Sequence, residues 1–299
     1  MKNTGFSEIT KERVIYNGLE PWYIEIALTG RCNFNCIYCN RFKKETNFKN
    51  VENYFSTFSK CKHVQLTGGE PTLHKDFLKF IFLCKQKSKT VGLSTNGTFG
   101  IDNYSKLNID MFSISLDDYD QNILINRGYK NPSKIIETIR ELSKNFYVNV
   151  GLVIDNINIS RLEDIIDFIL DLGVDDIKLS TNTKNELIPK FKKDYKEYPI
   201  LNYRINNFKQ NKQMRGFPSK KCHIAKNDIT IVGNKHYPCL IYFREGGKPI
   251  NNLNKNVYED RLIWFKNHNS QKDKICKKYC MDFKCEFNTY IDKNFIHSK

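Results

Sequence analysis

The chain has 299 residues, of which 40% are hydrophobic and 27% are charged, and it contains ten cysteines. This length and composition predict one large domain or two of moderate size with a buried core, which excludes wholesale disorder. No run approaches the ~20 apolar residues that a membrane span requires, and no apolar segment follows the first lysine as in a secretory signal. We therefore expect a cytoplasmic protein without a membrane partner. In that reducing compartment, ten cysteines indicate metal ligation rather than disulfides.

The formal net charge is +15, and its excess is concentrated in the last third of the chain. Residues 184–299 carry 25 Lys and Arg against 11 Asp and Glu, whereas residues 1–183 carry 23 against 22. A lysine-rich solvated surface is one interpretation. The other is a basic face for an anionic partner, such as a nucleic acid, a nucleotide or an acidic peptide.

Between about residues 22 and 180, β-branched or aromatic runs alternate with helical patterns, which is typical of βαβ units and a parallel sheet. The expected strands are Trp22–Leu28, His63–Leu66, Val91–Ser94, Met111–Leu116, Tyr147–Ile154 and Asp176–Leu179. The expected helices are Val51–Ser59, Asp76–Gln86, Asn103–Leu107, Lys134–Lys144 and Ser160–Leu172. This pattern predicts an α/β fold, an open, partial (β/α)6 TIM-like barrel, whose chemistry lies at the carboxyl ends of the strands.

Three residues are expected to delimit the last two of these helices. Ser133 can cap the helix that starts at Lys134, and Ser160 has Glu163 at capping-box spacing. Gly173 is expected to end the second helix as a C-cap residue.

After about residue 184 the pattern changes to a polar connecting segment and then to a small cysteine-rich α+β module. Strand Asp228–Val232, a turn at Gly233–Asn234 and strand Lys235–Ile241 read as a β-hairpin, and a helix is expected over Glu259–Asn267. The predicted division is an N-terminal extension 1–19, a barrel core 20–183, a connecting helical segment 184–216 and the cysteine-rich module 217–299.

The segment LTGRCNFNCIYCN follows the first expected strand and spaces Cys32, Cys36 and Cys39 as C-x3-C-x2-C. Three thiolates on one loop can hold three irons of a cubane cluster and leave the fourth iron open to another molecule. A zinc loop that lacks a ligand is the alternative, but zinc sites favour C-x2-C pairs and four ligands.

This loop, placed after the first strand of a partial β/α barrel, resembles the radical S-adenosylmethionine (radical SAM) superfamily over roughly residues 20–180. The motifs GGEP, STNG and SISLD match in strand order, and an arginine follows in NRGY. The resemblance implies a 4Fe–4S cluster with an open iron. It also implies that S-adenosylmethionine is cleaved reductively to a 5′-deoxyadenosyl radical, which abstracts hydrogen from a substrate.

The resemblance assigns the cofactor to residues of these motifs. The position before the third cysteine would contact adenine, the GGEP segment would bind the amino group, and the polar groups of the next two strands would bind ribose and carboxylate. The arginine is a further candidate partner of that carboxylate. The residues concerned are Tyr38, Gly68, Gly69, Glu70, Pro71, Ser94, Asn96, Ser115, Asp117 and Arg127.

A second group of five cysteines lies in the basic third of the chain: Cys222, Cys239, Cys276, Cys280 and Cys285. Their order resembles the auxiliary-cluster modules called SPASM and twitch domains. Because a full SPASM module has seven cysteines, the resemblance implies the shorter, twitch-like form, with one auxiliary 4Fe–4S cluster held by four of the five. Whether Cys280 or Cys285 is the spare stays open, and a structural zinc site is the alternative.

The sequence as a whole predicts a radical SAM enzyme that acts on a peptide or a small metabolite. Modification of a nucleotide or nucleic acid is the alternative that the basic third favours, and a non-catalytic iron–sulfur binding or sensing protein is an alternative of another class. An external one-electron reductant such as flavodoxin or ferredoxin is implied. Candidate contacts for an anionic substrate are Lys220, Lys221, Lys226, Arg244 and Lys248. His223 and His236 are secondary metal candidates because cysteines lie near them in the sequence.

Overall fold

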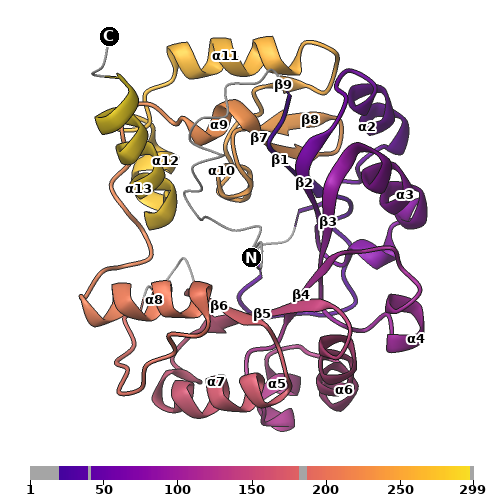
Figure 1. Cartoon of the computed structure of the whole chain (residues 1–299), viewed down its shortest axis with the longest axis vertical. Coiled ribbons are helices and arrows are strands. Elements are labelled where there is room, and N and C mark those ends of the chain that lie inside the picture. The colour runs from indigo at the N-terminus through magenta and orange to yellow at the C-terminus, as the bar shows by residue number, and fades with distance from the viewer. Residues whose placement is uncertain (1–19, 40–41, 182–186, 297–299) are drawn as a thin grey trace.

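The protein folds around one curved nine-stranded sheet with helices on its outer face (Figure 1). The computed structural model describes residues 20–39, 42–181 and 187–296, so the extension expected at 1–19 lies outside the described residues. The strand order is β6-β5-β4-β3-β2-β1-β7-β8-β9. The strands are β1 (Tyr23–Ala27), β2 (Cys61–Thr67), β3 (Ser88–Thr95), β4 (Met111–Ser115), β5 (Tyr147–Ile154), β6 (Asp176–Thr181), β7 (Asp228–Val232), β8 (Lys235–Tyr237) and β9 (Asn251–Asn252).

Strands β1 to β6 are parallel neighbours and form the predicted partial barrel. The α-helices of the described residues are α2 (Phe48–Phe55), α3 (Phe77–Lys87), α4 (Ile101–Tyr104), α5 (Gln121–Asn126), α6 (Pro132–Ser143), α7 (Leu162–Asp171), α8 (Pro199–Lys209), α9 (Ile224–Asn227), α10 (Leu240–Arg244), α11 (Val257–Asn267), α12 (Lys274–Tyr279) and α13 (Asp282–Ile291). Among these helices, none is long and apolar enough to cross a bilayer.

Alternation along the strands separates a dry outer face from a polar interior. On β1, Ile24 and Ile26 are fully buried in the core beneath the helices, while Glu25 between them points to the concave side. The same period puts Gln65 and Lys178 on the concave side of β2 and β6. The interior of the barrel is therefore lined by polar and charged groups rather than by a second apolar layer.

The helix starts predicted from Ser133 and Ser160 are wrong. Helix α6 begins two residues earlier than predicted, at Pro132, after Asn131 in the left-handed conformation (φ 50°), and Ser133 lies inside it. Ser160 lies in a 3-10 turn, and Glu163 accepts bonds from the backbone of Lys192 and Lys193. A tertiary contact thus replaces the local cap. Gly173 does follow the end of α7 with φ +85°, as predicted.

The hairpin of the cysteine-rich part continues the barrel sheet instead of forming a sheet of its own. Strand β7 lies parallel to β1, with Ile24 opposite Ile229, and β8 returns antiparallel to β7. The second strand is shorter than predicted, since it ends at Tyr237 and α10 follows directly after Cys239. Helix α5 was not predicted at all.

A buried ion pair joins α8, which packs on β6, to α13 in the cysteine-rich part. Asp282 accepts two bonds from the Arg204 guanidinium, at 2.6 and 3.1 Å, and one from Asn207 Nδ2 at 2.9 Å. Both charged side chains are less than one-tenth exposed. This pair therefore anchors the end of the chain to the open edge of the barrel.

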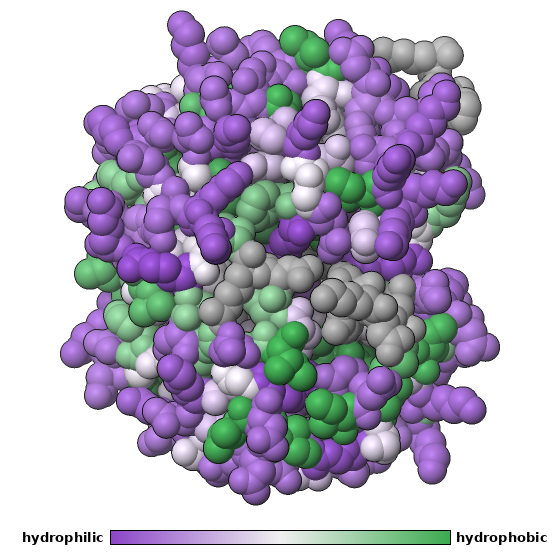
Figure 2. Space-filling view, turned by 180° about the vertical axis from the view of Figure 1, so that it is seen from behind, coloured by the Kyte–Doolittle hydropathy of each residue, from purple (hydrophilic) through white to green (hydrophobic). Residues whose placement is uncertain are grey.

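The upper and lower parts of the surface differ in hydropathy. Figure 2 shows the back of the molecule, where hydrophilic side chains cover most of the upper part, in which β7–β9 and α11 lie, and apolar ones gather mainly below.

Substituting Asp282→Ala should cost about 3–5 kcal/mol of unfolding free energy, because it leaves the Arg204 charge buried without its partner. Asp194→Ala is the matched control, since Asp194 pairs with Lys209 of the same helix at the surface, where solvent screens the pair and its loss should change stability little. Urea unfolding of the three proteins measures the difference. Equal losses would contradict an anchoring role for Asp282.

Candidate functional site

The first cysteine loop leaves the carboxyl end of β1 and closes on itself before α2. Gly30 N donates to Lys44 O at 2.9 Å, and Thr46 N donates to Leu28 O at 2.8 Å, so the two ends of the loop run side by side. The three cysteines of this loop therefore project from a closed base at the predicted edge of the sheet.

The GGEP segment after β2 holds this loop through backbone contacts. Gly69 N donates to Thr29 O at 2.6 Å, and Glu70 N donates to Arg31 O at 2.7 Å. A Cβ atom on Gly69 would lie 2.3 Å from Arg31 O, which no side chain can tolerate. In this structure, the glycine permits close approach to the cysteine loop.

A second glycine clamps the same loop from the other side. Gly128, with φ +94°, accepts a bond from Asn35 N at 3.1 Å, and a Cβ atom there would lie 2.2 Å from Asn35 O. Asn35 immediately precedes Cys36, so the backbone at Gly128 positions that cysteine.

The thiols of the loop lie in a partly buried, polar setting. Asn96 Nδ2 donates to Cys32 Sγ at 3.7 Å and to Asn33 Oδ1 at 2.7 Å. Burial, followed by the nearby Asp117 carboxylate, raises the pKa of Cys36 to about 11. The Cys36 thiol therefore has to release its proton when the sulfur binds a metal.

Glu70 and Asn96 are brought together at the ends of β2 and β3. The Glu70 carboxylate is fully buried and accepts bonds from Thr72 N at 3.2 Å, Thr95 Oγ1 at 2.8 Å and Asn96 N at 2.8 Å. It thereby positions Asn96, whose amide reaches Cys32. The geometry gives the Glu70 carboxylate a positioning role.

Another group of predicted cofactor residues, Tyr38, Asp117 and Arg127, is in mutual contact through Asp117. Asp117 is fully buried and accepts bonds from Tyr38 Oη and from Val153 N, the latter at 2.8 Å. Arg127, equally buried, pairs with Asp117 at 3.3 Å and with Asp155 at 3.1 Å. The guanidinium that was predicted to bind the cofactor carboxylate is thus engaged by two protein carboxylates.

The remaining predicted cofactor residues lie at the same edge of the sheet. Ser94 Oγ accepts a bond from Gln65 Nε2 at 2.9 Å, and Ser115 is exposed at the end of β4. Pro71 opens a 3-10 turn for which Glu70 is the N-cap. The structure therefore gathers the motif residues around the mouth of the barrel above β1–β4.

Four of the five C-terminal cysteines line one cavity: Cys222, Cys239, Cys276 and Cys280. Cys285 does not line it. Its sulfur hydrogen-bonds with Cys280 and lies 2.9 Å from where a Cβ on Gly216 would stand. The sequence did not indicate which of Cys280 and Cys285 is the spare cysteine. In the structure, Cys280 lines the cavity and Cys285 lies behind it.

Three of the four cavity cysteines have a polar hydrogen-bond partner beside the sulfur. Asn288 Nδ2 donates to Cys222 Sγ at 3.9 Å and Tyr242 N donates to Cys239 Sγ at 3.4 Å. His268 Nε2 lies 3.5 Å from Cys276 Sγ. Lys284 also lines the cavity. Such donors stabilise thiolates that carry negative charge.

The histidine that reaches a cysteine is His268, which the sequence did not single out. His223 instead bonds to Asp292 at 2.8 Å, and His236 is fully buried, with Asp260 3.7 Å away. Neither of these two lines the cysteine cavity. Burial lowers the pKa of His236 to about 3, so it stays neutral at physiological pH.

Two charged side chains, Glu25 and Lys178, lie on the concave side of the barrel sheet. Burial lowers the pKa of Lys178 to about 8, and Arg244 and Lys284 act in the same direction, whereas Glu25 opposes them. Three cations therefore act on one another and on Glu25 in this part of the barrel. The sequence does contain a signal for these interior charges, because Glu25 in YIEIA and Lys178 in DIKLST stand inside otherwise apolar strands.

The predicted basic contacts divide into three kinds. Lys221 Nζ donates to the carbonyl oxygens of Phe265 and His268 at the end of α11, and Lys226 lies over the Phe265 ring. Lys220 and Lys248 are exposed. Of the five, Arg244 is the one whose charge acts on the interior Glu25 and Lys178.

Residues 26–169 match the family model of the radical SAM superfamily. The barrel part of the chain, residues 26–169, is therefore a radical SAM domain. The predicted α/β fold with a partial barrel is confirmed.

Among curated proteins, the chain is similar to a probable GTP 3′,8-cyclase of Sulfurisphaera tokodaii, with 32% identity over 171 residues that cover 52% of this chain and 54% of that protein. The chain spans about half the length of the GTP 3′,8-cyclases that it matches. It is also 26% identical over 264 residues to the uncharacterized protein MJ0907 of Methanocaldococcus jannaschii, covering 78% of this chain and 88% of that one.

Two solved structures share the fold. That of anSMEcpe with bound AdoMet has a TM-score of 0.60 at 16% identity, covering 91% of this chain and 96% of that one. That of Streptococcus suis SuiB bound to S-adenosylmethionine has a TM-score of 0.57 at 17% identity, covering 83% and 66%.

Substituting Gly128→Ala should lower the iron bound at the first loop and the formation of 5′-deoxyadenosine, because the new Cβ displaces the backbone next to Cys36. Gly246→Ala is the matched control: its φ is +82°, but nothing lies within 4 Å of the added Cβ. Both variants should lose about 1–2 kcal/mol from the left-handed backbone. If both kept wild-type iron content, the clamp at Gly128 would not position the cysteine loop.

Proposed function

We propose that this radical SAM enzyme binds two 4Fe–4S clusters and uses the first to act on an anionic small molecule, with a nucleotide as the leading candidate. Cys32, Cys36 and Cys39 would hold the first cluster, and the cysteines that line the C-terminal cavity would hold the second. The observation that carries the proposal is that four cysteines line one cavity while three others stand on a closed loop of the neighbouring strand.

The spacing of the sulfur atoms favours clusters over single zinc ions. In the described residues, the one group of three ligand atoms that all lie within 4.8 Å of one another is His268, Asp273 and Cys276. A tetrahedral zinc site with ~2.3 Å Zn–S bonds would hold its sulfurs roughly 3.8 Å apart. Neither cysteine group is that tight, as expected for ligands at the corners of a larger cubane.

When bound, the first cluster would supply an electron for reductive cleavage of S-adenosylmethionine to a 5′-deoxyadenosyl radical, which abstracts hydrogen from the substrate. The residues of this chain would position the cofactor and the substrate and would exclude water from them. Asn96 would donate to the Cys32 thiolate, and Tyr38, which donates to the buried Asp117, would support the wall beside the cofactor. We assign the cofactor to the predicted motif residues, with Glu70 and Arg127 acting through their neighbours.

The two sites face the same interior. The first loop leaves the carboxyl end of β1, whereas Cys222 precedes the amino end of the parallel strand β7. The five residues of β1 separate these levels by roughly 16 Å at ~3.3 Å per residue. A substrate held by Lys178 and Arg244 would lie between them.

Two observations favour a nucleotide over a peptide. The chain is similar to proteins named GTP 3′,8-cyclase, and the interior and the last third of the chain are both basic. The solved SuiB structures include one bound to the precursor peptide SuiA, but that likeness is one of fold alone. A peptide substrate stays a prediction that the same binding assay tests.

We further propose the cytoplasm as the compartment, with flavodoxin or ferredoxin as the electron donor. None of the ten cysteines forms a disulfide. The barrel core 20–183, the connecting segment 184–216 and the cysteine-rich part 217–299 are proposed as functional regions. They share one sheet, since β7 pairs with β1.

Anaerobically reconstituted protein should hold about eight irons and should convert S-adenosylmethionine to 5′-deoxyadenosine under reductant. The triple variant Cys32→Ala, Cys36→Ala and Cys39→Ala should abolish that product and keep about four irons. Iron analysis and chromatography of the nucleoside measure both results. A triple variant that still forms 5′-deoxyadenosine would overturn the first site.

A matched pair tests the second site. Cys280→Ser should lose the auxiliary iron, whereas Cys285→Ser should keep it, because only Cys280 lines the cavity. About four irons with one zinc per wild-type chain would instead show that the C-terminal site is a zinc site.

Lys178→Met should weaken GTP binding at least tenfold, because it removes a cation from the barrel interior. In the wild type, affinity should fall as the pH rises through about 8, where Lys178 loses its proton, and this dependence should vanish in the variant. Affinity should also fall with salt, since the Debye length shrinks from ~10 Å at 0.1 M to ~3 Å at 1 M.

Lys255→Met, at an exposed position, is the matched control and should bind GTP as the wild type does. Titration calorimetry on the reconstituted enzyme measures all three proteins. GTP affinity that is equal in the wild type and in Lys178→Met would refute the interior nucleotide site, and substitution of GTP by an acidic peptide in the same assay tests the alternative substrate.

A further inference from the structure

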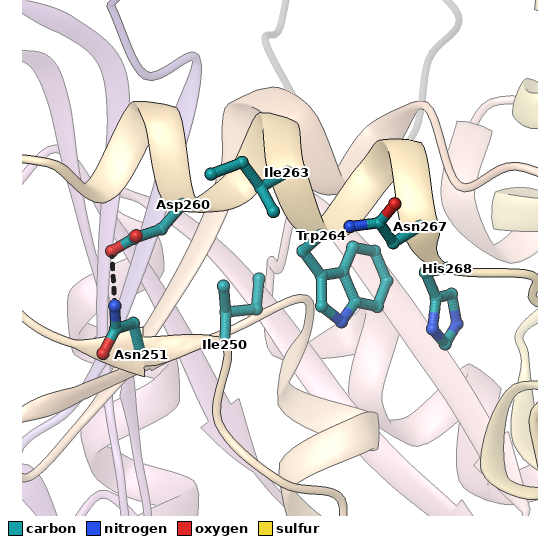
Figure 3. A pocket seen from close by; sticks show the side chains of 7 residues that line it. All are labelled: Ile250, Asn251, Asp260, Ile263, Trp264, Asn267 and His268. Atoms are coloured by element: carbon teal, nitrogen blue, oxygen red, sulfur yellow. Dashed lines mark hydrogen bonds between the residues drawn. The ribbon is translucent and has the colours of Figure 1, made fainter.

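A surface pocket of about 450 Å³ opens between β9 and α11, next to the auxiliary cysteine cavity (Figure 3). Its lining residues are Ile250, Asn251, Asp260, Ile263, Trp264, Asn267 and His268. Asn251 and Asp260 hydrogen-bond to each other at 3.0 Å on one side, while the Trp264 and His268 rings lie together on the other. Ile263 is 59% exposed and gives the pocket an apolar side chain that a partner can contact.

Trp264 is a wall shared by this pocket and the cysteine cavity, since it lines both. Its ring stacks on His268 with centroids 4.0 Å apart and planes 17° apart. His268 Nε2 in turn lies 3.5 Å from Cys276 Sγ. Two stacked aromatic rings therefore connect the surface pocket to a sulfur atom of the proposed auxiliary cluster.

This arrangement differs from what simple shielding of the cysteines would need. An aliphatic side chain at either position would exclude water equally well. The stacked rings instead divide the way from the surface to the sulfur into short steps, across which an electron can tunnel from ring to ring and then to Cys276. The path begins at the protein surface, where a redox partner can reach it.

The charge around the pocket indicates the kind of partner. Residues 248–278 carry eight Lys and Arg against three Asp and Glu. Seven of the eight are exposed lysines: Lys248, Lys255, Lys266, Lys272, Lys274, Lys277 and Lys278. An apolar centre with a cationic rim is complementary to an acidic protein surface. Electron-transfer complexes are small and transient, which suits a shallow pocket rather than an extended interface.

We propose that this surface docks an acidic one-electron carrier protein, of the flavodoxin or ferredoxin class, and that Trp264 and His268 conduct its electron to the auxiliary cluster. The inference rests on the proposed function, because it requires a cluster at Cys276. The carrier is oxidised by one electron and the cluster is reduced by one. No bond forms or breaks, and any proton of a flavin carrier stays with the carrier.

The test uses the reconstituted enzyme with reduced flavodoxin as the probe. Stopped-flow absorbance gives the rate of auxiliary-cluster reduction, and titration calorimetry gives the affinity for flavodoxin. Ile263→Asp puts a negative charge at the apolar centre and should weaken flavodoxin binding at least tenfold. Trp264→Leu should slow electron transfer at saturating flavodoxin while changing the affinity little. In the wild type, flavodoxin binding should weaken as salt rises.

Leu78→Asp is the matched control, because Leu78 is 64% exposed on α3, in the barrel part of the chain. It should leave flavodoxin affinity and cluster reduction unchanged. Equal affinity in Ile263→Asp and Leu78→Asp would overturn the docking surface, and an unchanged transfer rate in Trp264→Leu would overturn the path.

Failure of the proposed function is separable from failure of this inference. Iron content and reduction by dithionite, measured on the same samples, report whether the auxiliary cluster exists. Flavodoxin affinity reports on the surface in either case, so loss of binding in Ile263→Asp alone supports docking even where no second cluster assembles.

Discussion

The pairing of β1 with β7 is the interaction on which the rest of this structure depends. Five residues of β1 lie in parallel register with five of β7, from Tyr23 opposite Asp228 to Ala27 opposite Val232. Because β1 leads into the first cysteine loop and β7 follows Cys222, this one ladder sets the distance between the two cysteine groups. The Arg204–Asp282 pair then holds the last helix against the far edge of the barrel.

Many motif residues of this site contact one another. Glu70 positions Asn96, and Asp117 binds Tyr38 and Arg127; of these five side chains all but Tyr38 are buried. A buried carboxylate without such partners would be costly. These side chains therefore serve the site by fixing the loops that carry the thiols and the backbone groups around them.

The cysteine-rich part is built in the same way. Cysteines next to α9, at the start of α10 and in α12 reach one cavity, and three of them have a polar group beside the sulfur. Trp264 lines both this cavity and the pocket at the surface, and Lys284 lines the cavity as well. The cysteine cavity and the surface pocket therefore share a wall, and β7 joins this part of the chain to the barrel sheet.

What the sequence by itself determined follows from local patterns. Runs of β-branched or aromatic residues predicted the six barrel strands, and the spacing of Cys32, Cys36 and Cys39 with three motifs in strand order indicated the superfamily. Local rules failed at two places: Glu163 binds the backbone at 192–193 instead of capping α7, and α10 begins before the predicted end of a strand. Only the tertiary structure decided that Cys285 lies behind Cys280, that His268 rather than His223 reaches a cysteine, and that the charges of Arg244 and Lys284 act on Lys178. The physical reason is that these contacts join residues far apart in the chain, and their geometry is set by how the sheet curves and pairs rather than by any spacing along the sequence.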